Sequence, residues 1–288
     1  MVKSVGKPVF RSPSDDFSLY MGDALKLLAD FPDGSVDMVF ADPPYFLSNG
    51  GITCRSGRRV QVDKGGWDRS EGVEADFRFQ AAWLAQCRRV LKPNGTIWVS
   101  GTRHNIFSVG FAMQRLGYKL LNDITWYKKN PPPNLCCRYF THATETILWA
   151  ARSEKSRHFF NYALMKKANL GKQMQSLWTI LPPRNSEKLF GRHPTQKPIE
   201  LLERIVLAST QPGDVVLDPF SGSGTTGIAA ARHGRRYIGI ELQPQYLDLS
   251  VQRYLSETHT HVTDEVVDVE RPPVASGLEP LPMLLTPH

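Results

Sequence analysis

The four residues Asp42-Pro43-Pro44-Tyr45 bring a carboxylate, two rigid prolines and an aromatic ring to one point of the chain. Together they suit an exocyclic amino group of a nucleobase, whose nitrogen is a poor nucleophile because its lone pair is delocalised into the ring. If the Asp42 carboxylate and the Pro43 carbonyl each accept one amino hydrogen, the lone pair is localised and held in line with an electrophile. We expect Tyr45 to stack on a base taken out of the helix. The non-catalytic alternative is a strand that ends in a Pro-Pro turn with an Asp cap.

The residues before this set predict the element that positions it. Val36–Ala41 is an apolar run with the length of a buried strand, and two prolines cannot continue a sheet ladder. The chain after Asp42 therefore leaves the carboxyl edge of a sheet, where open α/β folds bind ligands. Strands and helices alternate along the rest of the sequence, which predicts a parallel sheet with helices on both faces.

A second strand, Val215–Asp218, runs into the glycine-rich turn 219–226 and a helix. Glycines let a ligand approach the backbone closely, and a helix N-terminus offers free N–H groups. The turn lacks the Lys-Ser/Thr ending of a P-loop and the spacing of a dinucleotide fingerprint. Glu241 ends the next predicted strand, where an acid can grip ribose hydroxyls. The pair predicts a nucleoside-binding site.

These two motifs carry a family resemblance. The sequence Asp-Pro-Phe-Ser-Gly-Ser-Gly-Thr-Thr at 218–226 resembles the S-adenosylmethionine-binding motif of amino-methylating DNA methyltransferases, and 42–45 resembles their catalytic motif. Gly22-Asp23 and 193–198 also match, so most of 18–256 is covered. The catalytic motif precedes the cofactor motif, as in the circularly permuted β class. RNA and protein-glutamine methyltransferases with a Pro-Pro-Tyr motif usually have the opposite order.

The resemblance implies a doubly wound, mostly parallel, seven-stranded Rossmann-like sheet with a small inserted DNA-recognition region. It also implies roles for individual residues. Glu241 would hold the ribose, Asp23 and Ala24 the adenine, and Thr195 and Lys197 would face the cofactor carboxylate. The full set of residues expected to bind the cofactor is Asp23, Ala24, Asp42, Thr195, Lys197, Asp218, Phe220, Ser221, Gly222, Gly224, Thr225 and Glu241.

The net charge of +7 is concentrated in one segment. Residues 151–192 hold nine Lys or Arg against two acids, so this segment alone carries +7 and the remainder is neutral. A glycine-rich loop at 46–74, expected to be mobile, is also basic. Basic insertions on a neutral scaffold indicate a nucleic-acid clamp. The residues predicted to contact double-stranded DNA are Arg55, Arg58, Arg59, Arg138, Lys166, Lys167 and Lys172.

The same patterns divide the chain. We expect an N-terminal arm (1–17), a catalytic half (18–150), a basic target-recognition insertion (151–192), a cofactor-binding half (193–257) and a Pro-rich tail (258–288). We expect the tail to be poorly ordered or to form a dimer contact.

Composition narrows the class further. Four cysteines without metal-ligand spacing predict neither a zinc site nor a disulfide framework, and no apolar run approaches the roughly 20 residues of a bilayer span. The N-terminus lacks the apolar core of a signal peptide. We therefore expect a cytoplasmic, nucleoid-associated protein without a metal.

The sequence leaves three alternatives open. The acceptor base is expected to be adenine at N6, but N4 of cytosine is an equally feasible amine. Members of the family that modify cytosine usually carry Ser where this chain has Asp42. The third alternative, after methylation of adenine and of cytosine, is a non-catalytic DNA-binding module with a degenerate cofactor site. Arg138, His142 and Glu145 either contact phosphate or the flipped base, or serve as caps and core residues.

Overall fold

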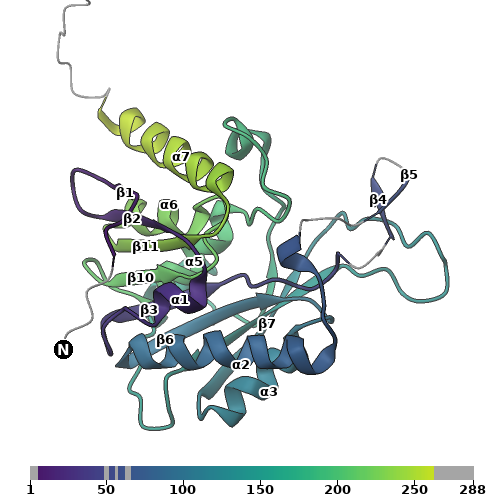
Figure 1. The fold of residues 1–288 in the computed structure, drawn as a ribbon, viewed down its shortest axis with the longest axis horizontal. Coiled ribbons are helices and arrows are strands. Elements are labelled where there is room, and N and C mark those ends of the chain that lie inside the picture. The colour runs from purple at the N-terminus through teal and green to yellow at the C-terminus, as the bar shows by residue number, and fades with distance from the viewer. Residues whose placement is uncertain (1–5, 49–51, 56–57, 62–65, 263–288) are drawn as a thin grey trace, which may run out of the picture.

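The computed structural model describes residues 6–48, 52–55, 58–61 and 66–262. Their central feature is a single sheet in the order β1-β2-β11-β10-β3-β6-β8-β7-β9, with a separate hairpin, β4-β5. The five neighbouring strands β2, β11, β10, β3 and β6 are all parallel. Strand β8 is antiparallel to both β6 and β7. Figure 1 shows the sheet with helices on either side. The predicted doubly wound α/β fold is confirmed.

The strands of the described residues are β1 (Phe10–Arg11), β2 (Phe17–Met21), β3 (Val36–Ala41), β4 (Ile52–Arg55), β5 (Arg58–Gln61), β6 (Leu91–Gly101), β7 (Lys119–Tyr127), β8 (Thr144–Ala151), β9 (Leu177–Thr179), β10 (Val215–Asp218) and β11 (Arg236–Glu241). The helices are α1 (Ala24–Leu28), α2 (Val73–Val90), α3 (Ile106–Arg115), α4 (Tyr162–Ala168), α5 (Ile199–Ser209), α6 (Thr225–Arg232) and α7 (Pro244–Val262), with short 3₁₀ turns η1 (Gly66–Asp68) and η2 (Asn185–Lys188).

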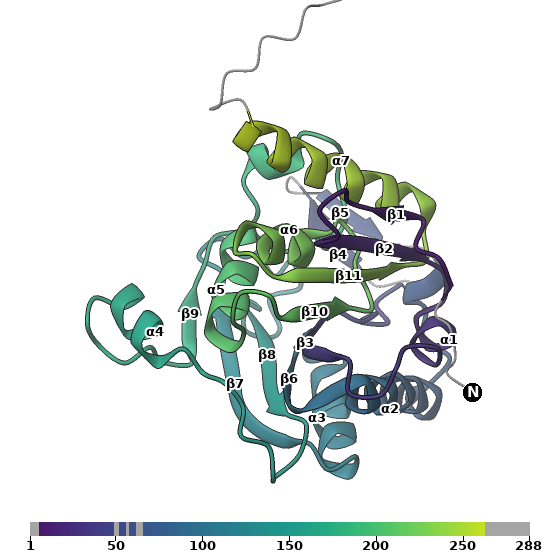
Figure 2. The same cartoon turned by 90° about the vertical axis from the view of Figure 1, so that its left-hand side faces the viewer.

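Alternate side chains of the strands feed two hydrophobic cores, one on each face of the sheet. Val39 and Ala41 of β3 pack with Trp83 of α2 on one face. Met38 and Phe40 of the same strand belong to the core on the opposite face, which α5, α6 and α7 cover. Figure 2 shows α1, α2 and α3 on one side of the sheet and α5, α6 and α7 on the other. With apolar contacts on both faces, β3 holds Asp42 at a fixed point of the carboxyl edge.

The sheet has nine described strands instead of the seven predicted, because a short strand is added at each edge. At one edge Phe10 and Arg11 pair antiparallel with β2. Phe10 packs against Phe17, which is fully buried, so the polar stretch predicted as an arm belongs to the domain from at least residue 9 onward. At the other edge β9, from within the predicted insertion, pairs parallel with β7.

Two further expectations changed at their boundaries. The 46–74 loop contains the β4-β5 hairpin, whose β-branched Ile52, Thr53 and Val60 favour strand over coil, and α2 begins at Val73. The Pro-rich tail was expected from residue 258, but α7 continues to Val262. Residues 263–288 lie outside the described part of the chain. Among the helices described, none combines the length and the apolar character needed to span a membrane.

The register of the sheet decides which loops lie near Asp42. Ala151, the last residue of β8, pairs with Thr96 of β6 and with Lys119, the first residue of β7. The chain therefore leaves β8 at the opposite ends of the parallel strands from Asp42, which we call the edge remote from Asp42. Asn161 then donates its amide to the Ala208 carbonyl at the far end of α5, 2.8 Å away. An 11-residue helix is about 15 Å long, which separates this point from the start of α5. Figure 2 accordingly shows α4 on the side facing the viewer and the β4-β5 hairpin faded behind.

Candidate active site at the carboxyl edge

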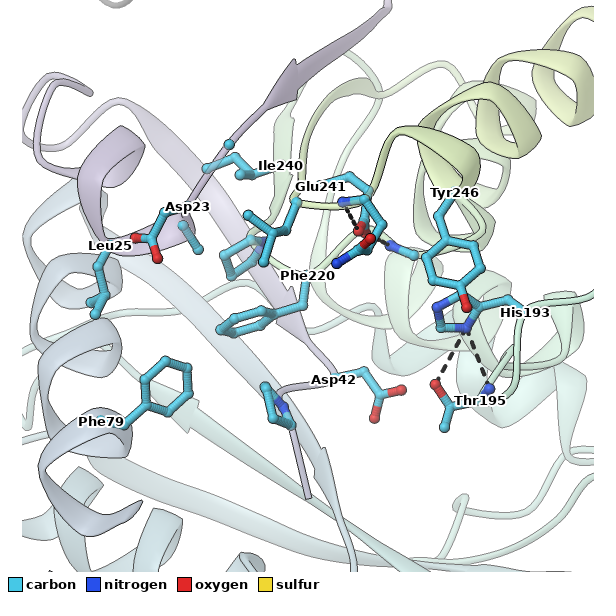
Figure 3. A pocket seen from close by; sticks show the side chains of 17 residues that line it. Asp23, Leu25, Asp42, Phe79, His193, Thr195, Phe220, Ile240, Glu241 and Tyr246 are labelled. Carbon is cyan, nitrogen blue, oxygen red and sulfur yellow. Dashed lines mark hydrogen bonds between the residues drawn. The ribbon is translucent and has the colours of Figure 1, made fainter. Parts of the chain in front are cut away.

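The carboxyl edge holds a cavity of about 260 Å³ between the ends of β2, β3, β10 and β11. Seven of the predicted cofactor residues line it: Asp23, Ala24, Asp42, Thr195, Phe220, Gly222 and Glu241. Figure 3 shows the side chains of Asp42, Phe220 and Glu241 around the same space. The lining contains three carboxylates and neither Lys nor Arg. Such a cavity favours a ligand that carries positive charge.

Glu241 is fixed by the backbone of the glycine-rich turn. Its Oε2 accepts the Gly222 amide at 2.7 Å and its Oε1 accepts the Gln243 amide at 2.8 Å. Burial raises the pKa of this carboxyl above its ordinary value, and the amide donors oppose the rise. Each oxygen of a carboxylate has more than one acceptor position, so the group can still accept hydroxyls from a ligand.

The other predicted cofactor residues of the turn support it from behind. Asp218 is buried, with Oδ1 accepting the Phe220 amide at 3.0 Å and Oδ2 accepting the Thr226 hydroxyl at 2.6 Å. Gly224 has a φ of 70°, and a Cβ there would lie 2.8 Å from Ser250 of α7. Ser221 and Thr225 are likewise buried, bonded to Tyr237 and Arg253 respectively. None of these four residues lines the cavity, so their direct contact with the cofactor stays a prediction.

Aromatic residues that the sequence analysis did not assign complete the walls. Phe79 of α2 lies opposite Phe220, with ring centroids 6.3 Å apart. The rings of His193 and Tyr246 pack edge to face with their centroids 4.2 Å apart. Nδ1 of His193 lies 3.3 Å from the Thr195 amide. A Cβ on Gly222 would lie 3.1 Å from the His193 ring. The closeness of the His193 ring explains why position 222 needs glycine. This ring belongs to a segment 29 residues away along the chain.

Beside the cavity, Asp42 belongs to a compact group of charged and hydroxyl side chains. Its Oδ1 accepts the Tyr45 hydroxyl at 2.5 Å, and its Oδ2 is in contact with Nζ of Lys197. Lys197 Nζ also lies 3.2 Å from the Tyr45 hydroxyl and 3.7 Å from Oε2 of Glu145. Glu145 in turn pairs with Lys128. The Asp42 carboxylate thus has a cation in direct contact and a second carboxylate just beyond it.

Lys197 is therefore not placed as predicted. We expected it to face the cofactor carboxylate, but its ammonium group is buried between Asp42 and Glu145 and is not part of the cavity lining. Burial by itself lowers the pKa of a lysine, but the two carboxylates more than offset this and raise the pKa of Lys197. The ammonium group lies against the Asp42 carboxylate because a buried ammonium needs a counter-charge.

Tyr45 also differs from the expectation. Its ring is buried, with 5% of its surface exposed, and its hydroxyl contacts Asp42 and Ser100 instead of leaving the ring face free for a base. Desolvation and the neighbouring carboxylates raise the pKa of this hydroxyl well above its ordinary value. Tyr45 thus acts in this structure as a hydrogen-bond donor that orients Asp42.

These features can be compared with known proteins. Residues 36–252 match the family model described as DNA methylase, of the N6/N4 type. The chain belongs to this family. The order of its two motifs along the chain, β3 before β10, remains the argument for the permuted β class, which the family match does not address.

Close relatives of this DNA methylase agree with the assignment. The chain is 54% identical to Type II methyltransferase M2.DpnII of Streptococcus pneumoniae over 244 residues, covering 84% of this chain and 91% of the relative. It is 51% identical to Type II methyltransferase M2.MboI of Moraxella bovis over 248 residues, covering 86% and 91%.

Solved structures share the fold. The M1.HpyAVI–SAM complex is 26% identical with a TM-score of 0.60, covering 83% of this methylase and 99% of that chain. The putative DNA modification methylase TTHA0409 of Thermus thermophilus, complexed with S-adenosyl-L-methionine, is 29% identical with a TM-score of 0.60, covering 83% and 95%. PvuII DNA methyltransferase (cytosine-N4-specific) has a TM-score of 0.69 at 24% identity, over 90% and 93%, which speaks for the fold alone.

Asp68 of this methylase was missed by the sequence analysis. It is fully buried, and its Oδ1 accepts the amides of Tyr45 and Phe46 at 2.9 and 2.8 Å. Its Oδ2 accepts the Leu47 amide at 3.2 Å and the Ser48 hydroxyl at 2.9 Å. This carboxylate therefore fixes the backbone that follows the catalytic motif, including Phe46, whose φ is 57°. In the sequence Asp68 stands beside Arg69 in a basic loop, as a simple counter-charge would. No local pattern distinguishes a counter-charge from a carboxylate that binds backbone amides.

The predicted DNA-binding residues fall in three places. The side chains of Arg55, Arg58 and Arg59 on the β4-β5 hairpin lie outside the described part of the structure. Arg138 is exposed on the loop 128–143, which joins β7 to β8 at the carboxyl edge. The lysines Lys166, Lys167 and Lys172 are exposed on α4 and just after it, near the edge of the sheet remote from Asp42.

Proposed function

We propose that this DNA methylase transfers the methyl group of S-adenosylmethionine to N6 of an adenine that is flipped out of duplex DNA at a specific site. The observation that carries this proposal is the position of Asp42. Its carboxylate lines the same cavity as Glu241 and Gly222 and is held by Lys197 and Tyr45. The acceptor group and the cofactor site are therefore adjacent.

The cavity fits S-adenosylmethionine, which is the cofactor of this enzyme and supplies an electrophilic methyl group on a positively charged sulfur. The three lining carboxylates suit that charge. Glu241, with its oxygens fixed by two amides, suits ribose hydroxyls. Phe220 and Phe79 offer apolar walls. Because the product of transfer loses the positive charge on sulfur, the same carboxylates favour release of the product over the substrate.

The residues of the β3 end provide the acceptor side. An ionised carboxylate accepts hydrogen bonds at about four positions. Two positions on Asp42 are taken by Tyr45 and Lys197, so others remain for an amino hydrogen. The Pro43 carbonyl follows directly along the chain and is proposed to accept the second hydrogen. Lys197 stays positively charged, because the neighbouring carboxylates raise its pKa, and it holds Oδ2 of Asp42 in place beside the cavity.

The identity of the base is tested directly by mass spectrometry of nucleosides from DNA treated with the purified enzyme and S-adenosylmethionine. We expect N6-methyladenine. Finding N4-methylcytosine alone would replace adenine by cytosine and leave the assigned residues intact, whereas no methylated nucleoside would refute the transferase. Single-molecule sequencing of DNA from a host that expresses the protein gives the surrounding sequence in the same experiment.

We propose that the DNA lies across the carboxyl edge, against the loop 128–143 and the end of the basic segment. After β9 the chain returns to that edge, where Oε2 of Glu187 accepts the Ile199 amide at 2.9 Å at the start of α5. Replacing Lys129 and Arg138 with Ala should lower the slope of log affinity against log salt by about 1–2 units, because each phosphate contact adds about 0.9. The matched change of Lys166 and Lys167 should alter the slope less, since α4 lies toward the other edge.

We further propose that the enzyme works on chromosomal DNA in the cytoplasm and that two copies can associate. Exposed apolar side chains such as Phe107 and Leu189 provide surface for such a contact. Analytical ultracentrifugation at several concentrations tests the association, and a monomer at all of them would contradict it.

A further inference from the structure

The loop 128–143 carries an aromatic side chain that nothing in the described structure covers. Phe140 is 96% exposed, and its neighbour Tyr139 is 57% exposed. Single exposed apolar residues are common, but a nearly complete exposure of a phenyl ring on a basic loop is not explained by packing. Lys129, Arg138 and His142 are exposed on the same loop. The ring therefore shares its loop with side chains that can contact phosphates.

The loop has a defined shape. Three consecutive prolines, 131–133, restrict the backbone of its first half. Nδ2 of Asn134 donates to the Tyr139 carbonyl at 2.5 Å, and Oδ1 of the same residue accepts the Cys136 amide at 3.2 Å. Cys137 has a φ of 50°, in the left-handed region. A segment held in this way presents Phe140 without a large entropic cost on binding.

The base of the loop is joined to the catalytic carboxylate. The Lys128 amide donates to the Ala143 carbonyl at 2.8 Å, which closes the loop. Lys128 pairs with Glu145, Glu145 lies 3.7 Å from Lys197, and Lys197 contacts Asp42. The loop therefore stands on the same edge as the proposed acceptor site and is connected to it by charged contacts. In Figure 1 its stem is the end of β7, on the side where the chain runs from β3 toward the β4-β5 hairpin.

A neighbouring loop contributes to the same surface. Hydrogen bonding to Cys136 raises the pKa of the Tyr139 hydroxyl, and the positive charge of Arg103 opposes that rise. Arg103 follows β6, so its charge acts on Tyr139 from a second connection at the carboxyl edge. A surface that combines an exposed ring with exposed cations on two neighbouring loops is complementary to stacked bases bordered by phosphates.

We propose that Phe140 inserts into the base stack of duplex DNA beside the target nucleotide and holds open the gap that the flipped base leaves. The inference rests on the proposed function, because it requires that the substrate be a base extruded from a duplex. Extrusion costs unpairing and unstacking, and apolar wedges inserted at a base step offset part of that cost. Tyr45, which is buried against Asp42, does not provide a free ring for this purpose.

The test compares methyl transfer to one oligonucleotide in three forms: a matched duplex, a duplex mismatched at the target base, and the single strand. The oligonucleotide carries the site located by sequencing methylated DNA. Phe140→Ala should lower kcat/KM on the matched duplex by about 5- to 150-fold, the range for one base–aromatic stack. The loss should shrink on the mismatched duplex and nearly vanish on the single strand, since little or no stack must be opened there. Phe140→Trp, which keeps an aromatic ring, should retain most of the activity.

Control variants and substrates distinguish a wedge from a different role of Phe140. Val9→Ala removes exposed apolar surface beside β1 and should change none of the three rates. An equal loss of Phe140→Ala activity on all three substrates would overturn the wedge, and so would undiminished activity on the matched duplex. A change in oligomeric state in ultracentrifugation would assign Phe140 to a contact between two copies instead. If the unaltered enzyme methylated none of the three DNA forms, the proposed function itself would fail.

Discussion

Asp42 directly follows the buried strand β3, Asp218 is the last residue of the buried strand β10, and each precedes a proline. The two strands are hydrogen-bonded neighbours. Both Asp218 oxygens are occupied within the adjoining turn, by the Phe220 amide and the Thr226 hydroxyl, and the side chain does not line the cavity. Asp42 lines the cavity and is held by Tyr45 and by Lys197, which lies 155 residues away in the sequence. The same Asp-Pro pair at the end of a buried strand therefore gives a carboxyl group that supports a turn in one place and a carboxyl group that faces the cavity in the other.

The two carboxyl groups also differ in charge environment. Burial raises the pKa of Asp218 to about 7, with the negative charges of Asp42 and Glu241 adding to the rise, while its hydrogen bonds oppose it. Asp42 instead has the buried ammonium group of Lys197 in contact. The contrast teaches that the role of a motif depends on which distant side chain reaches it, because that side chain sets the charge around the carboxyl group.

The largest effect should come from removing the acceptor. Asp42→Ala should lower kcat by at least about 10²-fold, the cost of losing one preorganised group that stabilises the reacting centre. Binding of S-adenosylmethionine and of DNA should be largely retained. Isothermal calorimetry measures the cofactor affinity of the same preparation, so that a misfolded variant is recognised. A variant with near-normal turnover would refute the role given to Asp42.

The cation that distinguishes Asp42 from Asp218 is the next target. Lys197→Met removes the buried ammonium group from between the partly buried carboxylates of Asp42 and Glu145, and breaking a buried ion pair costs up to about 3–5 kcal/mol. Denaturant unfolding should show that loss, and Lys197→Arg should recover part of it. Unchanged stability in the Met variant would mean that the contact with Asp42 contributes little in solution.

Asp218 should make the free energy of unfolding depend on pH. Its folded-state pKa of about 7 lies above the ordinary value of 3.8, so its contribution to stability is present below about pH 4 and is lost as pH rises through 7. Between pH 5 and pH 8 this group alone should lower the free energy of unfolding by about 2–3 kcal/mol, at about 1.36 kcal/mol per unit. Asp218→Asn should flatten the profile by that amount. Parallel profiles for the two proteins would contradict the assigned burial.

The smallest of these effects concerns the ribose partner. Glu241→Ala should weaken S-adenosylmethionine binding by about 1.5–3 kcal/mol, the range for hydrogen bonds to a charged group. Glu241→Gln keeps the shape and should lose less. An unaltered dissociation constant for the Ala variant would place the ribose elsewhere in the cavity.

The sequence predicted the parts of the site that are local. β3 and β10 have the predicted bounds because apolar runs that end at proline define a buried strand on their own. Glu241 and Gly222 both line the cavity, because Glu241 ends β11 and Gly222 lies in the turn after β10, on the ligand-binding edge. The two-residue β1 and the hairpin in the 46–74 loop were missed, since pairing with a partner strand stabilises them more than their own composition does.

Contacts between segments that lie far apart in the chain could not be predicted from the sequence. The partner of Lys197, the backbone clamp by Asp68 and the burial of Tyr45 all depend on chain segments that the fold alone brings together. The charge count of 151–192 was correct, but it did not reveal that the segment begins at the edge remote from Asp42. Net charge describes a segment's composition, and the sheet register decides which side of the molecule receives it.

Single-turnover methyl transfer by Asp42→Asn and Asp218→Asn, measured side by side with saturating cofactor and DNA, tests the central claim most directly. Both substitutions keep the shape of the side chain and remove one negative charge. We expect Asp42→Asn to be at least about 10²-fold slower than the unaltered enzyme. Asp218→Asn should stay within about tenfold, because its neighbours can re-form their hydrogen bonds with an amide. Equal rates for the two variants, or a slower Asp218→Asn, would contradict the assignment of Asp42 as the acceptor.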